Sequence, residues 1–416
     1  MLFRKKCLII ALIFFLDLSV YGQSYRGFQD EFNDIFRKAR ITLGPFRFYP
    51  LVQIRNIGYD TNTQFGDNAT PDYTGTLSAE ANVYLPFRNS LILSFQDSPE
   101  YNYYLRQRDR RIFTNSYAFS VKYLLFSRIV MFGRYHWDSH WRRFSSELGW
   151  QSRDMARGYD FGLFYETARK TYFGLTGTWN HQGYADIKTA DGIIPLSASL
   201  TRFERSGYFE FYYQIFHDSF LFTKVGTTDY QFENPEAIGR DAHSFQVYTG
   251  IRFPLLGVVQ GTLSLGYKKF IPRAADKKGF SGLVGDTSLD IRLGRIGIRL
   301  GYGRDTVFSY FSDISYVDNG YSAGLVFHLT QFLRLDCGFG YTKTEYPQPF
   351  VVDDGLGATR TILRRDRQFS FAPGFVIRIF RQNGIGVSWG SAQWTSTMPG
   401  IHRTRKSLNV FLTSQF

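Results

Sequence analysis

The sequence lacks a long apolar run beyond its first two dozen residues, although aromatic residues make up 18% of its 416 positions. A membrane-spanning helix needs about 20 consecutive apolar residues, so no later segment can cross a bilayer as a helix. Cysteine is also scarce, with only Cys7 and Cys337 present. Loss of Cys7 with an N-terminal leader would exclude an internal disulfide, so the fold must be stable without one.

The N-terminus has the pattern of a secretory signal peptide. Basic residues at positions 4–6 precede an apolar run, Cys7–Leu16, of the usual length. Asp17 interrupts that run, which argues against a permanent membrane anchor, and Cys7 stands at its start rather than at its end, where a lipoprotein cysteine lies. We place cleavage after Gly22, which predicts a signal peptide over residues 1–22.

The charge balance is basic, with a formal net charge of +13 that becomes +11 once the leader is removed. In a secreted chain, such a balance points to acidic surfaces such as lipid phosphate, or to anionic solutes. We do not expect a nucleic-acid partner.

From residue 41 onward, apolar and polar residues alternate with a period of two. Leu263, Leu265 and Tyr267, for example, alternate with Ser264 and Lys268. Strands place successive side chains on opposite faces, so each such segment has one apolar and one polar face. A soluble sandwich would have to bury these aromatic faces against each other, whereas a barrel turns them toward lipid.

Tight connections alternate with longer polar segments along this region. The turns are expected near residues 88–89, 127–128, 169–170, 217–218, 256–257, 294–295, 331–332 and 382–383, and the longer loops include 60–72, 106–111, 185–197, 234–241, 273–279 and 347–364. Short turns on one side and long loops on the other are typical of outer-membrane barrels. We predict an all-β fold, a transmembrane antiparallel β-barrel of about 18 strands (16–18) over residues 41–416, in the bacterial outer membrane.

Residues 23–40 form a separate periplasmic segment with helical periodicity. Phe28, Phe32 and Ile35 fall on one face of a short amphipathic helix. The pattern leaves two roles open: a cap packed on the inner mouth of the barrel, or a partner-docking helix or partial plug.

The last strand ends on an aromatic residue, Phe416, after the alternating apolar residues Leu408, Val410 and Leu412. This ending is similar to the signal read by the barrel assembly machinery, which is therefore an expected partner. Ser414 departs from that pattern, because an apolar residue is usual there.

Tyrosine and tryptophan gather near the expected strand ends, where amphipathic rings favour the membrane–water boundary. We expect these residues to form anchoring girdles: Tyr101, Tyr103, Tyr104, Tyr135, Trp137, Trp179, Tyr184, Trp389 and Trp394. The alternative is a path on which sugars stack, with Tyr212 and Tyr248 on the polar parity as candidates.

The polar parity also carries charges that are candidates for lining the lumen. These residues are Arg252, Arg292, Arg299, Arg334, Arg378, Glu210, Asp290 and Asp336. One interpretation is a hydrated wall whose opposite charges neutralise each other. The other is an electrostatic filter, and the basic excess favours anions. Basic clusters in or beside the loops, such as residues 106–111, suit the phosphates of lipopolysaccharide or an acidic polysaccharide.

Signals for enzymatic chemistry are weak. The seven histidines are scattered, no HExxH motif occurs, and we expect no metal, cofactor or catalytic residue. A hydrolase site built from loop residues such as His140 and His243 is the alternative from another class, and a non-conducting scaffold barrel is a third.

One local resemblance covers roughly residues 43–180. Leu43-Gly44-Pro45-Phe46, the corner Gly58-Tyr59-Asp60-Thr61-Asn62, and the strand that begins at Asp72-Tyr73 resemble the start of the β-barrel porin-2 group of outer-membrane proteins. The resemblance implies an outer-membrane barrel and, for some members, a link to exopolysaccharide export. Taken together, these observations predict passage of a polar or anionic solute, or of a polysaccharide, across the outer membrane.

Overall fold

The structure is a computed structural model that describes residues 27–63, 66, 69–143, 151–167, 171–189, 192–216, 219–234, 239–253, 257–310, 314–353, 359–380, 383–399 and 401–415. The predicted signal peptide and the terminal Phe416 lie outside these residues.

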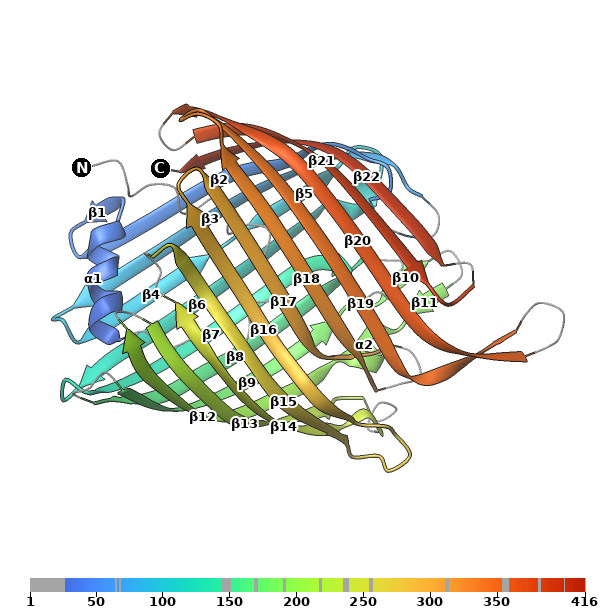
Figure 1. The fold of residues 1–416 in the computed structure, drawn as a ribbon, viewed down its shortest axis with the longest axis horizontal. Helices are drawn as coiled ribbons and strands as arrows, with labels where there is room; N and C mark the ends of the chain where they lie inside the picture. Colours follow the sequence, from blue (N-terminus) through green and yellow to red (C-terminus); the bar gives the residue numbers. More distant parts are fainter. Residues whose placement is uncertain are drawn as a thin grey trace.

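Within these residues, eighteen antiparallel strand positions close into one barrel (Figure 1). Each strand pairs with its neighbours in the chain, and the last strand pairs with the first long one. β4 and β5 share one position, because both lie between β3 and β6. The predicted fold class and strand number are confirmed. The barrel strands are β2 (Phe46–Asp60), β3 (Asp72–Phe87), β4 (Leu91–Asp97), β5 (Glu100–Tyr104), β6 (Ile112–Leu125), β7 (Ile129–Arg143), β8 (Gln151–Glu166), β9 (Thr171–Tyr184), β12 (Arg202–Phe216), β13 (Ser219–Phe232), β14 (Ala242–Phe253), β15 (Val259–Pro272), β16 (Phe280–Leu293), β17 (Ile296–Phe308), β18 (Ser315–His328), β19 (Leu333–Asp353), β20 (Thr359–Phe380), β21 (Asn383–Ser396) and β22 (His402–Gln415).

A few short elements accompany the barrel. They are α1 (Phe28–Lys38), β1 (Ile41–Leu43), η3 (Arg108–Arg110), β10 (Ile187–Thr189), β11 (Gly192–Ile194) and α2 (Leu196–Leu200). Among the described helices, none has the length and apolar character needed to cross a membrane.

The outer face of the barrel is apolar. The inner face carries polar residues and apolar clusters that are buried against other parts of the chain. On β15, Leu263, Leu265 and Tyr267 are 46%, 55% and 45% exposed, whereas Ser264 and Lys268, on the opposite parity, are buried. Leaving such rings and aliphatic chains in water would be costly, so this surface suits a hydrocarbon surrounding.

Short turns gather at one end of the barrel. Arg88 and Asn89 both have positive φ, of 47° and 53°, as do Phe126 and Ser127. Two consecutive residues with positive φ make a tight hairpin whose twist matches that of the strands. Both turns were predicted, whereas the turns predicted at 169–170 and 217–218 fall outside the described residues. Figure 1 places α1 and the last residues of β22 at this same end of the barrel.

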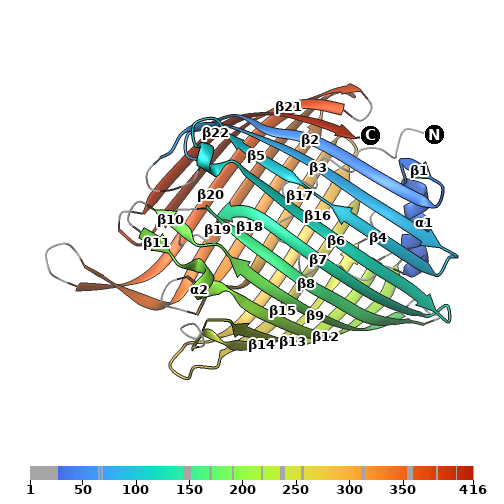
Figure 2. The same ribbon diagram turned by 180° about the vertical axis from the view of Figure 1, so that it is seen from behind.

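One predicted loop is wrong. Residues 347–364 do not form a loop throughout, because β19 and β20 continue pairing from Pro349 with Leu363 to Asp353 with Thr359. Aromatic and β-branched residues over 350–352 favour extended backbone, and this hairpin projects beyond the barrel wall (Figures 1 and 2).

Some of the expected girdle aromatics point inward instead. Trp394 is fully buried beneath the guanidinium of Arg403, whose carbon lies 3.8 Å from the ring centroid. Tyr184 is also buried, in an inner cluster. Tyr101 and Tyr103 remain exposed on the outer face, as expected.

Candidate functional site: the inner wall and its two mouths

Charged residues on the inner face occur mostly as local ion pairs between near neighbours. Each pair joins side chains on the same or nearby strands, with N–O distances between 2.6 and 3.1 Å: Lys224–Glu210, Lys268–Asp305, Arg334–Asp336, Arg202–Glu204 and Arg364–Asp366. A wall of this kind offers many hydrogen-bonding groups while the paired charges offset each other.

Seven of the eight predicted site residues lie close to the short-turn end of the wall, on β14, β16, β17, β19 and β20. Strand parity places them on the inner face, opposite exposed apolar residues of the same strands. We call this set the basic arc, and it consists of Arg252, Arg292, Arg299, Arg334, Arg378, Asp290 and Asp336.

The hydrogen bonds inside the basic arc join residues two apart on the same strand. Asp290 lies opposite Arg299 in the β16–β17 register and accepts a hydrogen bond of 3.3 Å from Arg292. Arg334 donates to Asp336 at 2.6 Å. The arc therefore contains five arginines and two aspartates, which leaves an excess of positive charge at this mouth.

Glu210, the eighth predicted residue, lies apart from the arc on β12. Its carboxylate accepts hydrogen bonds from Thr176 at 2.8 Å and from the hydroxyl of Tyr212 at 2.7 Å, and it pairs with Lys224. It is 4% exposed, so its charge is largely satisfied within the wall.

Helix α1 fills the other part of the short-turn mouth. Phe28, Phe32 and Ile35 are at most 6% exposed and pack on inner-face residues of β4, β7, β8, β9 and β12, among them Val130 and Phe164. The helical face read from the sequence is thus the face that contacts the wall. Figure 1 shows α1 at the short-turn end of the barrel, where these contacts hold it against the inner wall.

Polar contacts also hold α1 against the wall. The ammonium of Lys122 donates to both carboxylate oxygens of Glu31, at 2.6 and 2.7 Å. The hydroxyl of Tyr49 donates to the carbonyl of Ile35 at 2.5 Å. These bonds join the helix to β6 and β2 as well.

The long-loop mouth is narrowed by the segment between β9 and β12. Leu196 and Leu200 of α2 are fully buried against inner-face residues that include Tyr230, Phe270 and Phe308. The segment thus folds into the barrel instead of standing away from it. Sequence reasoning placed a polar loop at 185–197 and missed this, although two leucines four residues apart beside it were the available signal.

Two arginines hold this inward fold. Arg202 pairs with Glu204 and stacks on the ring of Phe308, with 4.4 Å from its guanidinium carbon to the centroid. Arg240 donates to the carbonyl oxygens of Ser199, at 3.0 Å, and Ser309. A charge-assisted bond to a carbonyl is stronger than a neutral one, so the segment is well anchored.

The two candidate sugar-stacking residues have different surroundings. Tyr212 packs between Phe164 and Phe222 in the cluster beneath α1 and is 4% exposed. Tyr248 lies on the inner face of β14, where it pairs in register with Lys224 and Gly266. Of the two, Tyr248 alone has a partly exposed ring.

The two histidines considered for a hydrolase site are not brought together. His140 lies on β7 and His243 on β14. Two other histidines contact acids: His136 lies 3.6 Å from Asp160, and His181 lies 2.8 Å from Glu233. Among the described residues, no serine or cysteine is hydrogen-bonded to either ring, and no group of histidine, cysteine and acidic residues could hold a metal ion.

Comparison with known proteins supports the fold. The fold resembles that of OccK2 (OpdF) of Pseudomonas aeruginosa, with a TM-score of 0.52 and 12% identity over 89% of this chain and 98% of that one. It also resembles a BenF-like porin of Pseudomonas fluorescens Pf-5, with a TM-score of 0.50 and 11% identity over 89% and 99% of the two chains. No family model and no curated protein matches the sequence.

The chain is an outer-membrane β-barrel. Its closed eighteen-stranded sheet, apolar exterior and polar interior are those of a membrane-spanning β-barrel. At this identity the likeness concerns the fold alone.

Proposed function

We propose that this barrel is a porin-like channel that passes polar solutes across the outer membrane and prefers anions. The supporting observation is the basic arc, where five arginines stand beside two aspartates at the mouth that α1 partly fills. A net positive charge on a low-dielectric wall raises the local concentration of anions.

The paired charges elsewhere limit how strong this preference can be. Lys224, Lys268 and Arg202 each have an acidic partner within 3.1 Å, so they add little net field. The selectivity should therefore depend on the arc, and it should weaken at high salt because screening shortens the reach of its charges.

Planar-bilayer recordings in a salt gradient test the proposal through the sign of the reversal potential. We expect anion preference, and we expect replacement of both Arg299 and Arg334 by serine to reduce it. Lys269→Ser is the matched control, because Lys269 is exposed on the outer face of β15. A cation preference would contradict the filter, and absence of conductance from the protein lacking α1 would contradict a channel.

Passage of an acidic polysaccharide is the second candidate, and it would use the same arc together with Tyr248 on the inner face of β14. Flux assays in liposomes separate the two. Uptake of small anions without uptake of charged oligosaccharides would favour the small-solute channel.

A further inference from the structure

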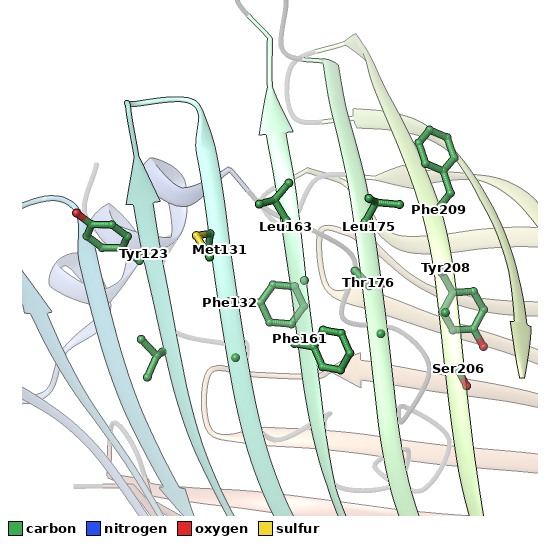
Figure 3. A pocket seen from close by; sticks show the side chains of 15 residues that line it. Tyr123, Met131, Phe132, Phe161, Leu163, Leu175, Thr176, Ser206, Tyr208 and Phe209 are labelled. Atoms are coloured by element: carbon green, nitrogen blue, oxygen red, sulfur yellow. The ribbon is translucent and has the colours of Figure 1, made fainter. Parts of the chain in front are cut away.

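A hollow of about 940 Å³ opens in the outer face of the barrel across β6, β7, β8, β9 and β12 (Figure 3). Its walls are apolar side chains that point away from the barrel, and Phe161, Leu175 and Phe209 are 57%, 61% and 47% exposed. The hollow therefore faces the membrane and not the lumen.

Three glycines form the floor of this hollow. In the strand registers, Phe161 lies opposite both Gly133 and Gly177, and Gly177 lies opposite Gly207. These four residues therefore form one row across β7, β8, β9 and β12. A Cβ added at Gly133 or Gly207 would meet no atom within 4 Å. The space over Gly133 and Gly207 thus exists because these outward positions lack side chains, whereas the ring of Phe161 already lies over Gly177.

An aromatic row borders the hollow on its long-loop side. The rings of Tyr135 and Tyr159 have centroids 5.1 Å apart, and those of Tyr159 and Trp179 are 5.8 Å apart. Amphipathic rings settle at the membrane–water boundary. The hollow therefore lies in the hydrocarbon just beneath the headgroups of the outer leaflet, since long loops face outward in such barrels.

Two exposed arginines lie at headgroup depth beside these rings. Arg205 pairs in register with Trp179 and stands two residues from Gly207 on the same strand, and Arg157 pairs with His181 in the next row. Asp229 lies opposite Arg205 in the β12–β13 register, but its carboxylate forms an ion pair with Arg273, at 2.7 Å. Over the described ranges, neither Arg157 nor Arg205 forms an ion pair.

We propose that this face binds lipid A, the phosphorylated and multiply acylated glycolipid of the outer leaflet. A phosphate would contact Arg157 and Arg205, and one acyl chain would lie in the hollow over the glycine floor. Guanidinium groups suit phosphate because they donate paired hydrogen bonds in one plane. Two cations without an acidic partner lie above an apolar hollow. This arrangement matches a molecule that carries a phosphate and an acyl chain together.

Native mass spectrometry of the full-length protein, reconstituted with purified lipid A and phosphatidylglycerol, tests this. We expect the wild type to retain lipid A and the Arg157→Ser/Arg205→Ser variant to bind it about tenfold more weakly, as expected for loss of charge-assisted contacts. Gly207→Leu should also weaken retention by filling the hollow. Lys269→Ser, on the outer face of β15, is the control and should retain lipid A like the wild type.

Equal retention by the wild type and the double arginine variant would overturn the proposal, as would equal retention of phosphatidylglycerol and lipid A. Heat-modifiable gel mobility identifies any variant that fails to fold, and the arginine variant keeps the glycine floor intact. Because these residues lie outside the lumen, ion selectivity should not change. Failure of this proposal is therefore distinguishable from failure of the proposed channel.

Discussion

The guanidinium of Arg405 lies 2.5 Å from the buried carboxylate of Asp60, and this ion pair joins the last strand of the barrel to the first. Asn62 adds a second link, since its backbone N–H donates to Asp60 at 2.9 Å and its side-chain amide donates to the carbonyl of Thr404 at 3.2 Å. At Gly58 a Cβ would lie 1.7 Å from the carbonyl oxygen of Leu408. The corner Gly58–Asn62 therefore has a structural role in barrel closure.

Asp60→Asn should destabilise that closure. The substitution removes the charge from a carboxylate that accepts bonds from Arg405, and we expect a loss of about 1–3 kcal/mol in the free energy of unfolding. The temperature at which the folded band disappears in heat-modifiable electrophoresis should fall. Asp276→Asn is the control, because the Asp276 side chain is 76% exposed in a loop. Equal unfolding temperatures for the two variants would contradict the closing role of Asp60.

The facing of β17 gives a second prediction. Ile298 shares the parity of the exposed Ile296 and Leu300, whereas Arg299 lies on the inner face opposite Asp290. Ile298→Arg should destabilise the barrel by less than the roughly 2–4 kcal/mol expected at the bilayer midplane, because Ile298 lies close to the short turn at 294–295. Arg299→Ser should be mild. Urea unfolding in lipid vesicles measures the stability of both variants, and similar tolerance at the two positions would contradict this facing.

Strand parity could be predicted from the sequence because the period of two is a local property. Ile298 and Arg299 needed only their immediate neighbours to be placed on opposite faces. The short turn at Arg88–Asn89 was equally local. Trp394 and Tyr184 were misplaced because an aromatic residue near a strand end can suit either the interface or the interior, and only its contacts decide.

The positions of α1 and α2 needed contacts far apart in the chain. The helical period marked Phe28, Phe32 and Ile35 as one apolar face, but it could not name β7, β8 and β12 as the surface beneath it. The basic arc was likewise a set of residues scattered in sequence. Closure of the sheet is what brings their strands to one mouth.

Helix α1 should restrict conduction through the short-turn mouth. Phe32→Asp places a charge in the cluster of Val130 and Phe164, so the helix should leave the wall and single-channel conductance should rise. The matched control is Asn33→Asp, whose side chain is exposed on the same helix. If both variants conduct like the wild type, α1 does not obstruct the pathway.

The inward segment at the opposite mouth should set the upper size of the solute. Leu200 is fully buried against the inner cluster, so Leu200→Asp would leave an unpaired carboxylate there and should release α2 from the wall. We expect larger neutral sugars to enter liposomes that contain this variant, measured by osmotic swelling. Ile193→Asp is the matched control, because Ile193 belongs to the same segment but is 65% exposed and should leave the size limit unchanged. An unchanged size limit in a folded Leu200→Asp variant would mean that the narrowest point of the pathway lies elsewhere. Helix α1 would then be the next candidate for that constriction, since it occupies the other mouth of the same barrel.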